Sequence, residues 1–158
     1  MRESASAPHL LAAEVAQVLL RTNGFALCVR AKAGPAGGRG PLAVVGGLLR
    51  AGEPLDAAAR RVTEDVSGVR VGPAQQEFCG LAHRRVPGGS DLVTAVFVAQ
   101  SWTGEPHNAE PDAHEGLYWV SMEEPPPDCH SHTAAVFRLL TQGPSYRALN
   151  WPVPKGVL

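Results

Sequence analysis

The 158-residue sequence lacks several features by which large protein classes are recognised. It has no apolar run long enough to cross a bilayer, and its three cysteines form no C-x-x-C pair. Its formal net charge is only -1, so it offers no basic surface for duplex nucleic acid. These absences argue against a membrane span, a disulfide framework and a duplex-binding protein. We therefore expect a cytoplasmic protein whose partner is a small molecule, with no membrane association.

Composition indicates one folded domain. Hydrophobic residues make up 44% of the chain and charged residues 18%, and a chain of this length buries roughly 70% of its unfolded surface. We expect a single domain over residues 1–158, with an N-terminal lead-in at residues 1–12 and a C-terminal tail at residues 143–158. The tail is apolar at its end and could cover a partner subunit, so a homodimer is among the expectations.

The order of apolar segments predicts alternating strands and helices. Two strands, at residues 15–20 and 25–29, flank Asn23-Gly24, a strong hairpin signal, and we expect them to pair antiparallel. Apolar residues three or four apart predict a helix over residues 55–67, which ends at Gly68. The other predicted elements are a glycine-rich loop at 32–41, strands at 42–49 (broken by Gly46-Gly47), 78–85, 92–102 and 117–120, and a helix at 131–141. Two helices among strands suggest an α/β sheet covered on both faces.

The stretch GGLLRAGEPLDAAARRVTEDVSGV, residues 46–69, resembles the signature of the Nudix hydrolase superfamily, in particular of its small MutT-like members. That signature is G-x5-E-x7-R-E-U-x-E-E-x-G-U, in which U is a bulky apolar residue. Five of its fixed positions are matched without a gap, by Gly47, Glu53, Arg61, Gly68 and Val69. The resemblance covers most of the chain. It implies the Nudix fold, an α/β/α sandwich with a central mixed sheet, and Mg²⁺-dependent hydrolysis of a nucleoside diphosphate linked to a second group, X.

The signature is degenerate at the positions that matter for the metal. Val62 and Val66 stand where the family carries glutamates, and Asp65 is the one helix carboxylate left in place. Mg²⁺ neutralises the phosphates and helps to activate water, and a valine supplies no oxygen ligand for it. Burying a valine stabilises the fold by roughly 1.5 to 3 kcal/mol. We therefore predict that both valines pack rather than coordinate, and that Mg²⁺ binding is weak or altered.

The resemblance implies a reduced catalytic set of Glu53, Arg61, Asp65 and Glu115, with the three carboxylates as metal ligands. For Glu53 we favour an ion pair with Arg61 that fixes the loop, with metal binding as the alternative. Glu115 lies near the place where MutT-like proteins carry a loop carboxylate that serves as metal ligand, base or nucleobase contact.

Other polar residues are candidates for substrate binding or for a second metal. These are Glu110 and Asp112 beside Glu115, and the arginines Arg39, Arg50 and Arg84, which could contact phosphate or lie in exposed loops and a charged hairpin end. The cluster Cys129, His130 and His132 could bind zinc, but we favour helix capping and exposure to solvent.

Two functions fit these observations. The first is a Nudix-type hydrolase of a nucleoside diphosphate linked to X, or of a related diphosphate, with impaired or non-standard metal use. The second is a Nudix-fold protein without that activity, which binds a ligand or serves a specialised metabolic step. Family resemblance favours the first function, and the two valines favour the second.

Overall fold

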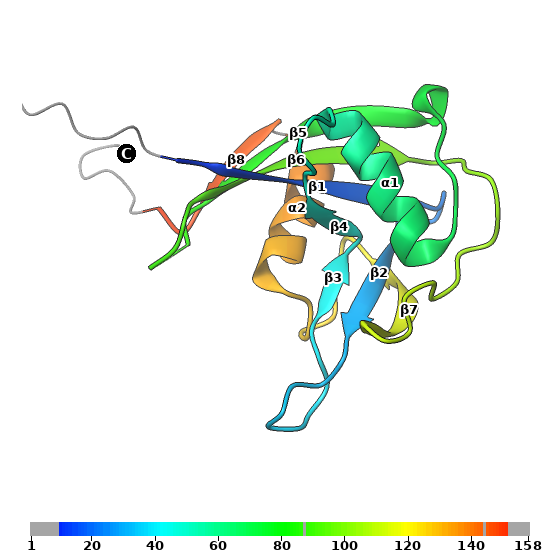
Figure 1. Ribbon diagram of the computed structural model, residues 1–158, viewed down its shortest axis with the longest axis horizontal. Helices are drawn as coiled ribbons and strands as arrows, with labels where there is room; N and C mark the ends of the chain where they lie inside the picture. The colour runs from blue at the N-terminus through cyan, green and yellow to red at the C-terminus, as the bar shows by residue number, and fades with distance from the viewer. Residues whose placement is uncertain (1–9, 87, 144, 152–158) are drawn as a thin grey trace, which may run out of the picture.

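The computed structural model describes residues 10–86, 88–143 and 145–151. Within them the chain forms strands and two α-helices in the order shown in Figure 1. The elements are β1 (Ala12–Leu19), β2 (Phe25–Ala31), β3 (Leu42–Val44), β4 (Gly46–Leu48), α1 (Leu55–Ser67), a 3-10 turn (Pro73–Gln75), β5 (Gln76–Arg84), β6 (Leu92–Ala99), β7 (His114–Ser121), α2 (Ser131–Gln142) and β8 (Tyr146–Leu149). Neither α-helix has the length and hydropathy needed to cross a membrane.

The strands form a five-stranded sheet, β4-β1-β6-β5-β8, and a three-stranded sheet, β3-β2-β7. The larger sheet is mixed, because β1 pairs parallel with β6 and β5 pairs parallel with β8, while its other pairs are antiparallel. Side chains alternate between the faces of a strand. On β1, Val15 and Leu19 join the apolar cluster of α1, whereas Ala16 and Val18 join that of α2. The helices thus cover opposite faces, which confirms the predicted α/β/α sandwich.

Helix α1 begins and ends where the sequence predicted. The helix ends at Gly68, whose φ of 72° is in the left-handed region that glycine adopts readily. The Gly68 N–H donates to the Glu64 carbonyl. Thr63, at a signature position that is usually apolar, is fully buried, and its hydroxyl donates to the Ala59 carbonyl at 2.7 Å. A buried polar residue is therefore accommodated without an unpaired hydroxyl.

The predicted hairpin between the first two strands is wrong. A turn does form, with Gly24 N–H donating to the Arg21 carbonyl, but Leu20 and Ala26 make only an isolated bridge before the strands diverge into different sheets. Both edges of β1 are occupied by β4 and β6, so β2 pairs with β3 and β7 instead. A local turn signal cannot reveal this competition.

Several other boundaries also differ from the sequence prediction; for example, β1 begins at Ala12 rather than at residue 15, and β6 ends at Ala99 rather than at residue 102. The segment 42–49 is divided into β3 and β4, which lie in different sheets. Strand β7 begins at His114 rather than at residue 117. Strand β8 lies in what was predicted to be a tail, where it pairs with β5. The end of that tail, residues 152–158, lies outside the described residues.

Candidate active site

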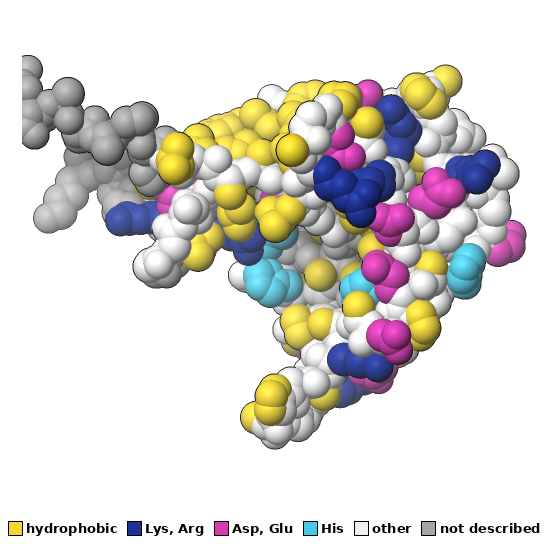
Figure 2. All heavy atoms as spheres, viewed as in Figure 1, with side chains coloured by type: hydrophobic (Ala, Val, Ile, Leu, Met, Phe, Trp, Pro, Cys, Tyr) yellow, Lys and Arg dark blue, Asp and Glu magenta, His cyan; other side chains and the backbone are white. Residues whose placement is uncertain are grey.

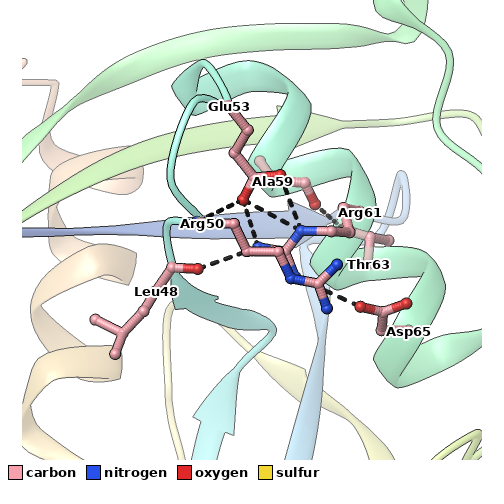
Figure 3. Close-up of polar contacts among 7 residues, drawn as sticks. All are labelled: Leu48, Arg50, Glu53, Ala59, Arg61, Thr63 and Asp65. Carbon is pink, nitrogen blue, oxygen red and sulfur yellow. Dashed lines mark hydrogen bonds and ion pairs between the residues drawn. The ribbon is translucent and has the colours of Figure 1, made fainter.

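The loop before α1 is tied to the helix by one ion pair. Arg61 donates from Nη2 to Glu53 Oε1 at 2.6 Å and from Nε to Glu53 Oε2 at 3.0 Å, and it also reaches the Leu48 carbonyl (Figure 3). The backbone N–H of Arg50 donates to the same Glu53 carboxylate at 2.8 Å. These hydrogen bonds, that from Arg61 first, lower the pKa of Glu53 to about 2. The carboxylate is therefore ionised, and its hydrogen bonds hold the loop against the helix.

The face of α1 that carries the two valines is closed. Val62 and Val66 are each only 6% exposed and belong to the apolar cluster formed with β1 and β6. A Cβ built on Gly47 would come within 3.2 Å of Val62 Cγ2, so the strand carrying the signature glycine lies directly against this side chain. The valines pack, as the sequence predicted, and supply no oxygen ligand to a cation.

The end of α1 is held by the loop between β6 and β7. The His107 N–H donates to the Ser67 carbonyl, and the Ala109 N–H donates to the Val66 carbonyl. The imidazole of His107 lies over Gly68, because a Cβ on that glycine would clash with the ring. These contacts satisfy carbonyls that a helix end otherwise leaves unpaired.

The carboxylates present do not fit a Mg²⁺ site of the usual kind. Asp65 is half-exposed, and its Oδ2 lies 3.5 Å from Arg61 Nη1, so the same arginine contacts both signature acids (Figure 3). Mg²⁺ requires near-octahedral oxygen ligands. Among the described residues no three acidic, histidine or cysteine side chains are grouped closely enough to hold a metal ion.

Among the described residues the predicted loop acids make no ion pair or side-chain hydrogen bond with Glu53 or Arg61. Glu115 is exposed on β7, on the same side of that strand as Leu117 and Trp119, which pack against the apolar cluster of α1. Glu110 and Asp112 are exposed in the loop before β7, and the carbonyl of Glu110 accepts from the backbone of Ala113 and His114. The backbone of this loop, rather than Glu115, makes the hydrogen bonds to α1.

A pocket of about 260 Å³ lies on the other side of β1, beside the signature glycine Gly47. Its lining includes Gly46 and Gly47 of β4, Glu14 of β1, Arg84 of β5 and His132 of α2. The face shown in Figure 2 is hollowed below the level of α1, and histidine side chains lie at the edge of the hollow. This pocket is small, and it joins the signature residue Gly47 to charged side chains.

The charged side chains of the pocket converge on Glu14. Its Oε1 accepts from Thr94 Oγ1 at 2.6 Å and from Arg84 Nη2 at 3.3 Å, and it lies 3.4 Å from His132 Nε2. Burial lowers the pKa of His132 to about 4, although the charge of Glu14 acts in the opposite direction, so the imidazole is neutral at pH 7. Of these residues the sequence singled out Arg84 and His132. Glu14 could have been noticed as the one charged residue in the apolar segment AAEVAQVLL.

The remaining candidates do not form a second site within the described residues. Arg39 and Arg50 are exposed in separate loops. His130 caps α2, since its Nδ1 accepts from the His132 N–H at 3.1 Å, which confirms the capping role that we favoured. Asp128 is paired with Arg30 at 2.6 Å. The Cys129 thiol packs against the apolar cluster of α2.

Comparison with known proteins identifies the class. The NUDIX domain family model matches residues 10–140, which is most of the chain, and the chain therefore belongs to the NUDIX domain family. Among solved structures, a MutT NUDIX hydrolase from Burkholderia pseudomallei is 23% identical, with a TM-score of 0.73, over 84% of this chain and 100% of that one.

Two further structures share the fold. A NUDIX hydrolase from Nitrosomonas europaea is 19% identical, with a TM-score of 0.69, over 87% of this chain and 93% of that one. The MutT protein from Methanosarcina mazei Go1 is 16% identical, with a TM-score of 0.66, over 87% and 98% of the two chains. No curated protein matches significantly. At these identities the structural matches speak to the fold alone.

Proposed function

We propose that the chain is a hydrolase of a nucleoside diphosphate linked to X, or of a related small diphosphate, with weak or altered use of Mg²⁺. The observation that carries this proposal is the pocket beside Gly46 and Gly47, in which Glu14 and Arg84 come together. Hydrolysis forms a bond from the water oxygen to phosphorus, breaks the bridging P–O bond and transfers the water proton to a base. The three unpaired cysteines suit the reducing cytoplasm, where we expect the protein to act.

The pocket offers complementary groups for the two ends of such a ligand. The guanidinium of Arg84 favours phosphate oxygens. The Glu14 carboxylate can accept hydrogen bonds from N–H or O–H groups of the organic moiety, while Val15 and Val44 supply apolar lining. A ligand that satisfies both ends would be held in one orientation.

Metal use in this proposal depends on few protein oxygens. Asp65 keeps its signature position, and Glu53 is engaged by Arg61. We propose that Glu115, on β7, contributes to turnover as a base or as a metal ligand. We also propose that four residues of exposed loops contact the substrate only when those loops close over it: Glu110, Asp112, Arg39 and Arg50. Mg²⁺ binding to the protein alone should therefore be weak.

A second candidate function is ligand binding without hydrolysis. The burial of Val62 and Val66 favours it, because the helix face that bears metal ligands in the family is occupied by packing. The pocket would then serve recognition only. Turnover, rather than binding, separates the two candidates.

A binding screen followed by a turnover assay tests the proposal. Thermal-shift measurements over nucleotides, sugar nucleotides, CoA derivatives and prenyl diphosphates, with and without Mg²⁺, should reveal a ligand whose effect is lost in Arg84→Gln but kept in the exposed control Arg70→Gln. A ligand at about 100 times its dissociation constant stabilises the fold by about 2.7 kcal/mol.

Whether that ligand is converted to product then decides between hydrolysis and binding alone. For a hydrolase, Glu115→Gln should reduce turnover by roughly 10² to 10⁴ if it is the base, whereas Glu124→Gln, an exposed control, should not. Binding without any product would favour the second function. Unchanged turnover in Glu115→Gln would remove that residue from the site.

A further inference from the structure

The outer strands of the larger sheet leave an apolar surface open on the side of α1. Helix α1 packs on β1, β4 and β6, and β5 and β8 extend beyond it. Phe78 of β5 is 56% exposed, Tyr146 of β8 is 55% exposed and Trp151, just after β8, is 40% exposed. Figure 2 shows hydrophobic side chains gathered along this part of the molecule, over the strands labelled β5, β6 and β8 in Figure 1.

Strand register shows that these side chains share one face. Phe78 is paired with Phe97, a residue of the α1 cluster, and their rings lie 5.5 Å apart. Leu81 is paired with both Ala95 and Tyr146, and directly paired residues point to the same side of a sheet. At the far end Trp151 packs on His83, with ring centroids 5.0 Å apart. We call this set, Phe78, Leu81, His83, Tyr146 and Trp151, the outer sheet face.

We propose that a second copy of this chain packs against the outer sheet face to form a symmetric dimer. An aromatic side chain carries roughly 200 Å² of surface, so three of them at about half exposure leave on the order of 300 Å² open. The partly exposed Val93 and Ala148 lie on the same side of neighbouring strands, and Leu11, which is 53% exposed, directly precedes β1 at the same end of the sheet. Together they raise the apolar total to on the order of 500 Å².

This area matches what a stable dimer needs. Homodimer interfaces are about 65% apolar, so an apolar core of that size corresponds to roughly 800 Å² per copy. That is the size of a standard protein interface. Arg85 lies over the ring of Trp151, 5.6 Å from its centroid, and places a charged group at the Trp151 end of the face. An interface core with a polar border has this arrangement. Two-fold symmetry lets the same face serve both copies.

Light scattering coupled to size-exclusion chromatography tests this proposal without any substrate. The unmodified protein should have about twice the chain mass of 16.6 kDa at micromolar concentration. The variant Phe78→Gln with Tyr146→Gln should have the monomer mass while keeping the circular dichroism spectrum of the unmodified protein. Leu48→Gln is the matched control, because Leu48 is 63% exposed and is paired with Glu14, whose side chain points to the α2 side; it should remain dimeric.

Oxidative footprinting of the unmodified protein gives a second readout that needs no variant. Labelling of Phe78 and Tyr146 should rise several-fold on dilution to the monomer, while labelling of Leu48 stays constant. A monomer at every concentration would overturn the proposal and leave this face to a different protein. A dimer that survives the double substitution, or labelling that does not change on dilution, would also overturn it.

Discussion

Restoring the lost carboxylates of α1 tests how the valines act. In the variant Val62→Glu with Val66→Glu, two side chains that are each 6% exposed become acids. The lost burial alone costs roughly 1.5 to 3 kcal/mol per valine, or about 3 to 6 kcal/mol for both. Since the free energy of unfolding of a domain is only about 5 to 15 kcal/mol, the variant should be only marginally stable without metal.

The expected change in melting temperature is large enough to measure easily. One kcal/mol shifts the melting temperature of a domain of this size by roughly 2 to 4 °C, so we expect a decrease of about 6 to 24 °C at pH 7 without Mg²⁺. A cation bound between the new glutamates and Asp65 should restore part of it, about 2.7 kcal/mol at 100 times its dissociation constant. Mg²⁺-dependent diphosphate hydrolysis should appear or rise in parallel.

Differential scanning fluorimetry with and without Mg²⁺ is the assay, and Val62→Gln with Val66→Gln is the control. The glutamine pair loses the same apolar burial but supplies no charge, so Mg²⁺ should leave its melting temperature unchanged. Two results would refute the reasoning. One is a glutamate variant as stable as the unmodified protein without Mg²⁺, and the other is strong Mg²⁺-dependent hydrolysis by the unmodified protein that survives Asp65→Asn.

Three further predictions concern stability, each measured by urea denaturation. Gly68→Ala should cost at least 1 to 2 kcal/mol, because φ is 72° and the new methyl would meet the His107 ring; adding His107→Ala should recover only the steric part. Gly47→Ala should cost about 1 kcal/mol through its 3.2 Å approach to Val62, and Val62→Ala should reduce that cost in a double-mutant cycle. The folded-state pKa of His132 is about 4 against 6.5 when unfolded, so its contribution is present above pH 6.5 and is lost as the pH falls toward 4. That loss amounts to roughly 3 kcal/mol, and His132→Gln should flatten the dependence; equal slopes for the two proteins would contradict it.

Local sequence information was sufficient for α1. The apolar spacing from Leu55 to Val66 and the glycine stop at Gly68 are short-range signals, and the helix has the predicted bounds. The predicted pairing of the first two strands was wrong for the opposite reason, because strand partners are determined by residues far apart in the sequence. Ala12 of β1 is paired with Leu92 of β6, and nothing near Asn23-Gly24 in sequence reports that pairing.

The candidate site divides in the same way. Glu53 and Arg61 are eight residues apart in one signature, so their ion pair could be anticipated. Glu14 meets Arg84 and Thr94 across 70 and 80 residues, and the pairing of β6 with both β1 and β5 brings them together. Spacing along the chain therefore could not predict that these three residues meet in one pocket.

The signature positions that survive in this chain are those that shape the backbone. Gly47 allows β4 to approach Val62, Gly68 takes the left-handed turn beneath His107, and Arg61 ties the loop to the helix through Glu53. None of these contacts needs a metal ion in order to form. The two positions that lost a carboxylate, Val62 and Val66, are ones whose family role is to bind a cation, and their valines add burial to the same scaffold. Loop geometry and metal ligation are thus separable here, which is why two substitutions on α1, without any change to the loop, should be enough to recover a cation site.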